Sequence, residues 1–275
     1  MLYVSYEVET MLYESDMPEI LEKYRDLIYK TYDDPSVCTE VVTKPLTYED
    51  LAVLSEFLER VYGLQDELAD ENEVKMRTSL HTTFTQSKKR DVSMHQRFIK
   101  CAIRNAIKYY TTIIYLLCHV KDDYDTRGTY FRYYYVSYHD YQESKDLYPA
   151  VFCPNYDYND LPIYHKVEWR IPDSPIYRPS AVIDYYIILK AFTVFDFTNK
   201  GKNISKKEIA INKKVAKRMH SRDVYYLPDI LEEIPLADAL VEKQLKELID
   251  MTEKKGNKRF RQILKDALDS LPSLL

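Results

Sequence analysis

The residues with the clearest chemical potential lie in short alternating segments that favour β-strands. Glu7 and Glu9 are two residues apart near the start of the chain, His81 lies within TSLHTTF, and Glu168 and Arg170 are two apart within YHKVEWRIPDS. Side chains two residues apart in a strand point to the same face of a sheet. Carboxylates and one imidazole are ligands that suit Mg²⁺ or Mn²⁺, and a guanidinium suits phosphate oxygens. These segments therefore predict sheet faces that could hold a metal ion and a phosphate.

Each of these signals also has a plain structural interpretation. A solvated sheet face carries the same residue types, and Glu168 with Arg170 could form an ordinary cross-strand ion pair. Glycine content adds a constraint, because the chain has only 4 glycines. Walker and Rossmann loops need several glycines so that backbone amides can approach phosphate. A bound nucleotide would have to be held by charges and metal ions instead.

The overall composition predicts a soluble globular protein. The 275 residues are 45% hydrophobic and 30% charged, with a net charge of -5 that argues against a nucleic-acid partner. The first residues alternate apolar and polar types without the pattern of a signal peptide, and no apolar stretch is long enough to span a membrane. The 4 cysteines are scattered without a CxxC pair, which favours a reducing, cytoplasmic location.

Hydrophobic periodicity predicts an alternation of strands and helices through the first two thirds of the chain. Strands are expected at 2–12, 37–43, 75–85, 130–138 and 164–171, and helices at 18–32, 48–62, 91–117 and 179–192. Thr47 is the expected cap of the second helix, and Gly63 is its expected end. This order predicts an α+β fold in which helices pack on one face of an antiparallel sheet.

The character of the sequence changes after Phe197. A boundary is expected near residue 198, which separates a catalytic domain at 1–198 from a basic, helical C-terminal extension at 199–275. Nine lysines and arginines occur between residues 200 and 222. A solvated helix face is the favoured interpretation of this run, and a lid over ATP phosphates or a nucleic-acid contact are the alternatives.

Four short motifs in order resemble those of a known enzyme superfamily. They are YEVE at the start, DDPSVCTEVVTKPL after a helix, TSLHTTF after another helix, and VEWRIPDSPIYRPSAVIDYYIILKAF near residue 170. Across roughly residues 3–195 the sequence resembles the amidoligase branch of the glutamine synthetase-like carboxylate–amine ligases. In that family an E-x-E strand opens the domain, and a late E-[FW]-R strand precedes a helix. The resemblance implies a glutamine synthetase-like catalytic fold, ATP and Mg²⁺ or Mn²⁺ as cofactors, and carboxylate and amine substrates, with a peptide or protein among the candidates.

The resemblance also implies roles for individual residues. The implied metal ligands are Glu7, Glu9, Glu40, His81 and Glu168, with Glu40 also a candidate for binding the amine. Arg170 would contact the transferring phosphate as a catalytic and nucleotide-binding residue. Arg127 and Arg132, in DTRGTYFR, are similar to family arginines that hold substrate carboxylate or phosphate.

The main hypothesis from the sequence is an ATP-dependent ligase that forms an amide or isopeptide bond through an acyl-phosphate. Thr83 stands where the family often has a second histidine, and Ser5 stands where it usually has a glycine before E-x-E. An alternative therefore stays open, in which the chain is an inactive member of the fold that binds a partner through its basic C-terminal region. Phosphorylation of a small molecule or protein is a third hypothesis, and an oligomer is compatible with all three.

Overall fold

The computed structural model describes most of the chain. The described residues are 2–33, 37–68, 78–86, 92–127, 151–152, 165–170, 174–198, 204–219, 224–253 and 257–271. The expected strand at 130–138 and residue Arg132 lie outside them.

A six-stranded sheet, antiparallel at every pairing, forms the base of the fold, in the spatial order β2-β3-β1-β4-β7-β6. Its strands are β1 (Leu2–Thr10), β2 (Ile28–Asp33), β3 (Thr39–Thr43), β4 (Leu80–Gln86), β6 (Val151–Phe152) and β7 (His165–Trp169). The longest strand, β1, lies inside the sheet between β3 and β4. The sequence prediction of strands at the start of the chain, before the second helix, after the acidic loop and near residue 168 is confirmed.

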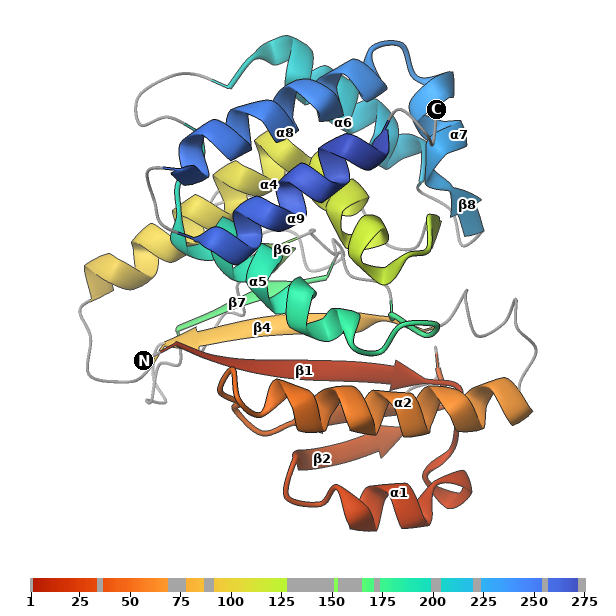
Figure 1. The fold of residues 1–275 in the computed structure, drawn as a ribbon. Helices are drawn as coiled ribbons and strands as arrows, with labels where there is room; N and C mark the ends of the chain where they lie inside the picture. The colour runs from red at the N-terminus through yellow and green to blue at the C-terminus, as the bar shows by residue number, and fades with distance from the viewer. Residues whose placement is uncertain are drawn as a thin grey trace.

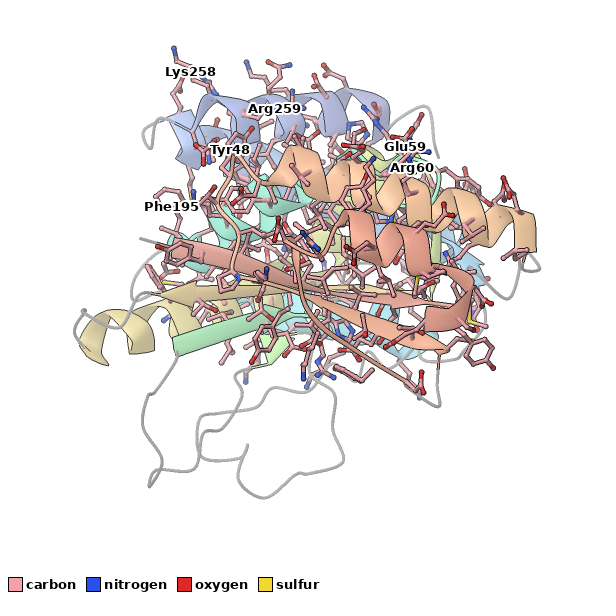
Figure 2. The ribbon with its side chains drawn as sticks, turned by 90° about the horizontal axis from the view of Figure 1, so that it is seen from below. Tyr48, Glu59, Arg60, Phe195, Lys258 and Arg259 are labelled. Carbon is pink, nitrogen blue, oxygen red and sulfur yellow. The ribbon has the colours of Figure 1, made fainter. Side chains whose placement is uncertain are left out.

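Helices cover one face of this sheet. The helices nearest to it are α1 (Pro18–Lys23), α2 (Leu51–Leu68) and α5 (Ala181–Val194). The Phe84 ring of β4 lies 5.9 Å from the Tyr186 ring of α5, and the Trp169 indole N–H of β7 donates a hydrogen bond to Thr193 of α5. Figure 2 shows α2, with Glu59 labelled, and α9 on the same side of the sheet. The expected α+β class, with helices packed on one sheet face, is confirmed.

The C-terminal half is mostly helical and packs on the long helix α4 (Val92–Lys121), as Figure 1 shows. It contains α6 (Lys206–Arg218), α7 (Leu227–Glu233), α8 (Ala237–Glu253) and α9 (Lys258–Ser270), with a short strand β8 (Val224–Tyr226) that pairs with β5 (Asp125–Arg127). In the N-terminal half, a 3-10 turn, Glu14–Asp16, precedes α1. Buried side chains from both halves belong to one hydrophobic cluster. The domain boundary near residue 198 stays a prediction.

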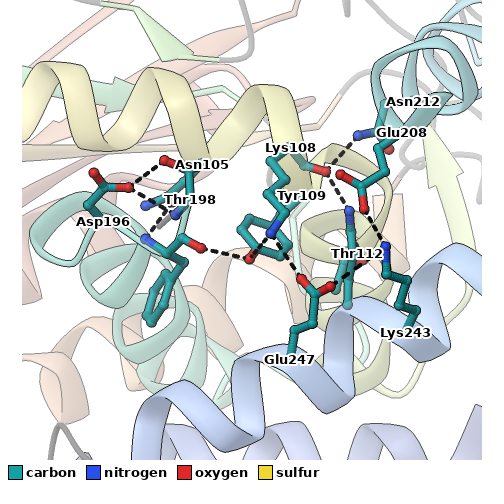
Figure 3. Close-up of polar contacts among 12 residues, drawn as sticks. Asn105, Lys108, Tyr109, Thr112, Asp196, Thr198, Glu208, Asn212, Lys243 and Glu247 are labelled. Carbon is teal, nitrogen blue, oxygen red and sulfur yellow. Dashed lines mark hydrogen bonds and ion pairs between the residues drawn. The ribbon is translucent and has the colours of Figure 1, made fainter. Parts of the chain in front are cut away.

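A buried polar network joins α4 to α6 and α8 where α4 bends (Figure 3). Tyr109 has non-helical backbone angles, φ −110° and ψ 17°, so the regular hydrogen bonds of α4 are interrupted there. The Asn212 amide of α6 donates to the carbonyls of Ile107 and Lys108, and the Gln244 amide of α8 also donates to Lys108 O. These side chains satisfy backbone groups that the bend would otherwise leave unpaired inside the protein.

One predicted helix was wrong in its second half. The periodicity through residues 18–32 predicted one helix, but α1 ends at Lys23 and the chain then forms β2 from Ile28 to Asp33. The segment Ile28-Tyr29-Lys30-Thr31-Tyr32 is rich in β-branched and aromatic residues, which favour strands. Pairing with β3 therefore prevailed over the helical spacing of the apolar residues.

The expected end of the second helix at Gly63 was also wrong, because α2 continues to Leu68. Apart from its chain neighbours and the backbone of its own helix, no described atom lies within 4 Å of the position of a Cβ at Gly63, so this glycine makes no close approach. The helix is extended by tertiary contacts, since Gln65 is fully buried and its Oε1 accepts hydrogen bonds from Thr10 Oγ1 and the Met11 amide. The helix also begins later than expected, at Leu51. Thr47 donates through both its amide and its hydroxyl to Asp50 in the turn before it.

No helix among the described residues has the length and apolar character needed to cross a membrane.

Candidate metal and phosphate site

The strand β1 separates an apolar face from an acidic one. Val4, Tyr6 and Val8 are fully buried and face the helices. Glu7 and Glu9 alternate with them and point to the opposite face, as strand periodicity predicted. The side chains of Glu7 and Glu9 remain partly accessible, at 29% and 13% exposure. The two carboxylates therefore occupy the face that α1, α2 and α5 do not cover.

Sheet register brings the other predicted residues next to this pair. Glu7 lies opposite His81 of β4, and Glu9 lies opposite Glu40 of β3. Opposite residues in an antiparallel pair have Cβ atoms about 5 Å apart, so their side chains can interact directly. Four predicted metal ligands thus lie side by side on three neighbouring strands.

The fourth strand, β7, adds Glu168 to the same face. Glu168 lies opposite Thr83, two residues beyond His81 on β4, and its side chain is almost completely buried. Arg170 follows at the end of β7, and its Nε donates to Glu168 Oε1 in an ion pair. Glu168 and Arg170 therefore do form an ion pair. The pair joins two residues at the end of the same strand and does not cross between strands, and it lies at the edge of the acidic cluster.

The His81 ring is the centre of the cluster. Its Nδ1 lies 3.3 Å from Glu7 Oε2 and 3.8 Å from Glu168 Oε1, and its Nε2 lies 3.8 Å from Glu9 Oε1. One ligand atom each from Glu7, His81 and Glu168 can be chosen so that all lie within 4.8 Å of one another. This spacing is compatible with a single divalent cation among the three, since metal–oxygen and metal–nitrogen distances are about 2 to 2.5 Å.

The electrostatics of the cluster indicate an excess of buried negative charge. Burial raises the pKa of Glu168, and the Glu7 charge adds to this effect although Arg170 opposes it. Burial by itself disfavours a protonated His81, but the Glu7, Glu9 and Glu168 carboxylates outweigh it, so the pKa of the imidazole is raised. A divalent cation bound among these carboxylates would offset both the burial of Glu168 and the repulsion between it and Glu7. Oxygen ligands and one imidazole are a donor set that fits Mg²⁺ or Mn²⁺.

Glu40 occupies the β3 side of the cluster. It is 7% exposed, and the Tyr32 hydroxyl of β2 donates a hydrogen bond to its Oε1. Burial raises the pKa of Glu40 to about 7, Tyr32 opposes the shift, and Glu7 and Glu9 add to it. A carboxylate with this pKa can take up and release a proton near neutral pH.

The raised pKa of Glu40 predicts a specific pH dependence of stability. The pKa of Glu40 is higher in the folded state than its ordinary value of 4.5, so the folded state binds its proton more tightly than the unfolded state. The resulting stabilisation of the metal-free protein is complete below pH 4.5 and is lost as the pH rises towards 7. We expect the free energy of unfolding to fall by up to about 3 kcal/mol from this group over that range. In Glu40→Gln the fall should be smaller. Urea unfolding in EDTA at pH 5 and pH 7.5 measures it, and equal falls in both proteins would contradict the assignment.

Two residues of the site were missed by sequence reasoning. Tyr32 was placed in the predicted helix at 18–32, where its approach to Glu40 could not be foreseen. Ser79 lies within TSLHTTF, two residues before His81, and the sequence assigned it no role. Its hydroxyl donates to Glu9 Oε2 at 2.5 Å and lies 3.2 Å from His81 Nε2. The signal that could have found Ser79 is its spacing of two residues from His81. Thr83 has the same spacing, so the signal does not single out Ser79.

Ser79 is therefore expected to orient Glu9 rather than to bind a ligand itself. Removing its hydroxyl in Ser79→Ala should weaken Mn²⁺ binding about tenfold, because residues that orient metal ligands contribute to affinity at that level. Isothermal titration calorimetry with Mn²⁺ measures the change. Ser55→Ala on α2 is the matched control and should bind Mn²⁺ as the unmodified protein does. Unchanged affinity in Ser79→Ala would show that Glu9 does not need this hydrogen bond.

The predicted arginines upstream of β7 are not brought to the cluster by the described part of the structure. The backbone of Arg127 ends β5, where it pairs with Val224 of β8 in a separate two-stranded sheet. Arg132 lies outside the described residues. Roles for both in binding substrate or nucleotide stay predictions.

Comparisons with known proteins add a distant structural likeness. No family model matches the chain, and no curated protein matches it in sequence. Among solved structures, the chain is similar to one in the crystal structure of the complex between the Prokaryotic Ubiquitin-like Protein Pup and its Ligase PafA. The TM-score is 0.40 and the sequence identity is 10%, with 99% of this chain and 63% of that chain covered. The present chain thus spans less than two thirds of the length of the chain it matches.

Proposed function

We propose that this protein is an ATP- and divalent-metal-dependent ligase that joins a carboxylate to an amine. The observation that carries the proposal is the convergence of Glu7, Glu9, His81 and Glu168, with Arg170 beside them, on one face of the sheet. These residues come from three strands far apart in the sequence, and they are the residues that the motif resemblance names. A solvated surface would have no reason to bury Glu168 and His81 among other carboxylates.

The proposed reaction has two steps. A carboxylate oxygen of the first substrate attacks the γ-phosphorus of ATP, the bond to the bridging oxygen breaks, and ADP leaves. The amine nitrogen then attacks the carbonyl carbon of the acyl-phosphate, phosphate leaves with the bonding electron pair, and the nitrogen loses a proton. Both steps concentrate negative charge on phosphate oxygens, so catalysis depends on fixed positive charge around them.

The side chains of the cluster fit these requirements. Glu7, Glu9, His81 and Glu168 would hold one or more divalent cations, which would neutralise phosphate charge when bound. Arg170 supplies a fixed guanidinium, oriented by its ion pair with Glu168, that suits the oxygens of the transferring phosphate. No glycine-rich loop is required in this arrangement.

Glu40 is the residue proposed to accept the proton from the amine. Its pKa of about 7 places it near the range in which a general base is effective, and the Tyr32 hydroxyl holds its orientation. Its position opposite Glu9 puts it beside the cluster.

ADP release and amide formation test the proposal together. The full chain is incubated with MgATP and a panel of amino acids, dicarboxylates, peptides and amines, and both ADP and condensed products are measured. The expected result is ADP release that depends on both a carboxylate and an amine, with an amide detected by mass spectrometry. ADP with a phosphorylated product and no amide would indicate a kinase instead. Neither nucleotide binding nor ADP release across the panel would overturn the ligase assignment.

A further inference from the structure

The helix α6 has two faces of different character. Ile211, Asn212, Val215 and Ala216 are buried and pack towards α4 and α8. Figure 1 places α6 at the end of the molecule away from the six-stranded sheet, with α4 between them. Whatever the outer face of α6 binds is therefore remote from the metal and phosphate site.

The outer face carries a concentrated positive charge, which we call the α6 lysine face. It consists of the exposed residues Lys206, Lys207, Lys213, Lys214 and Lys217. At 3.6 residues per turn these five positions fall within an arc of roughly 120°. The only acidic residue of the helix, Glu208, is buried and pairs with Lys243 of α8.

The five lysines form no ion pair with the described acidic residues, whereas other basic side chains on this surface do. Arg218, at the end of the same helix, pairs with Glu233 at 2.8 Å. Lys246 pairs with Glu242 on α8. Like charges on neighbouring turns of a helix repel, so an uncompensated lysine face lowers helix stability in the absence of a ligand. A polyanion bound along this face would remove that repulsion.

The side chains around these lysines favour phosphate over protein as the ligand. Protein interfaces are depleted in lysine and use buried aromatic or arginine anchors. None of the exposed large hydrophobic residues in the described part of the chain lies on α6. Lysine ammonium groups act as point charges that bind phosphate without a planar fork. Single-stranded nucleic acid is usually held by stacked aromatic rings, which this face also lacks.

The length of the face fits a nucleic-acid backbone. Lys206 and Lys217 are eleven residues apart, which corresponds to about 16 Å along a helix. At 3.4 Å per base step, that length matches about five base pairs of a duplex. We propose that the α6 lysine face binds the phosphate backbone of double-stranded nucleic acid without reading base sequence. This function is separate from the proposed ligase reaction. The net charge of -5 opposes binding to a polyanion, so we expect binding only at low salt.

Fluorescence anisotropy with a labelled 20-base-pair DNA duplex tests the proposal. The full chain is titrated at several KCl concentrations, and the slope of log affinity against log salt counts the phosphates contacted. Each lysine contact contributes about 0.9 to this slope. The variant K206Q/K213Q/K217Q should bind at least tenfold more weakly in low salt, with the slope reduced by about 2.7.

Three controls separate this site from general charge effects. K246Q/K258Q/K265Q changes the net charge equally, using exposed lysines of α8 and α9, and should bind the duplex like the unmodified protein. K206R/K213R/K217R keeps the charge and should retain binding. A single strand of equal length and poly-L-glutamate should compete poorly with the duplex. The proposal is overturned by absence of binding in low salt, by equal loss in both glutamine variants, or by equal competition from either polymer.

Discussion

Replacing Glu168 by glutamine is expected to lower ATP-dependent ADP release about a thousandfold while the protein remains folded. The size of the effect follows from the position of Glu168, which is almost completely buried between His81 and Arg170. Loss of one preorganised charged group from an active site commonly lowers the rate by about 10²- to 10³-fold, and here a metal ligand would be lost as well. Steady-state ADP release measures the rate, and thermal unfolding measures whether the fold survives.

Glutamine is the informative replacement at this position. It preserves the size of the side chain and removes its charge. Burial raises the pKa of the Glu168 carboxyl, which means that the fold disfavours the charged form, so loss of the charge should not destabilise the metal-free protein. Glu59→Gln on α2 is the matched control, because Glu59 is exposed on the helix-covered side of the sheet (Figure 2). Glu59→Gln should release ADP at the rate of the unmodified protein. An unchanged rate of ADP release in Glu168→Gln would remove Glu168 from the site.

Asn212→Ala is expected to lower the free energy of unfolding by about 3 kcal/mol. Asn212 is fully buried, donates to the carbonyls of Ile107 and Lys108, and accepts from the Thr111 hydroxyl at 2.7 Å. Alanine would leave several buried groups at the bend of α4 without partners, and each such group costs about 1 to 3 kcal/mol. Gln244 still contacts Lys108 O, which limits the loss.

Urea unfolding measures this loss, and Lys214→Ala on the exposed side of the same helix is its control. Substitution at an exposed position away from special features usually changes stability by less than about 0.5 kcal/mol. If Asn212→Ala and Lys214→Ala unfold at the same urea concentration, the network in Figure 3 does not stabilise the packing of α6 on α4.

Much of the site could be predicted from the sequence because strand periodicity is local. The spacing of Glu7 and Glu9, and of Glu168 and Arg170, determines which face of a strand each side chain takes. The motif resemblance then named Glu40 and His81 on other strands, which periodicity alone could not place beside β1. The register observed between β1, β3, β4 and β7 brings them together.

What could not be predicted depends on contacts with other elements of the fold, which local sequence patterns do not encode. Ile28 to Tyr32 has helical spacing but the composition of a strand, and pairing with β3 selects the strand that brings Tyr32 to Glu40. The extension of α2 beyond Gly63 depends in the same way on Gln65, which bonds to Thr10 at the end of β1. Asn212 gave no local signal, because its partners lie about 100 residues earlier. Such long-range polar contacts prevail over local propensity wherever they satisfy buried groups.

Binding of Mn²⁺, followed by the electron paramagnetic resonance signal of the free ion, tests the central claim most directly. The unmodified chain should remove free Mn²⁺ from solution in a saturable way, with higher affinity when ATP is present, and Glu168→Gln should bind at least about tenfold more weakly. Absence of saturable binding, or equal binding by Glu168→Gln, would show that the carboxylates around His81 do not form a metal and phosphate site.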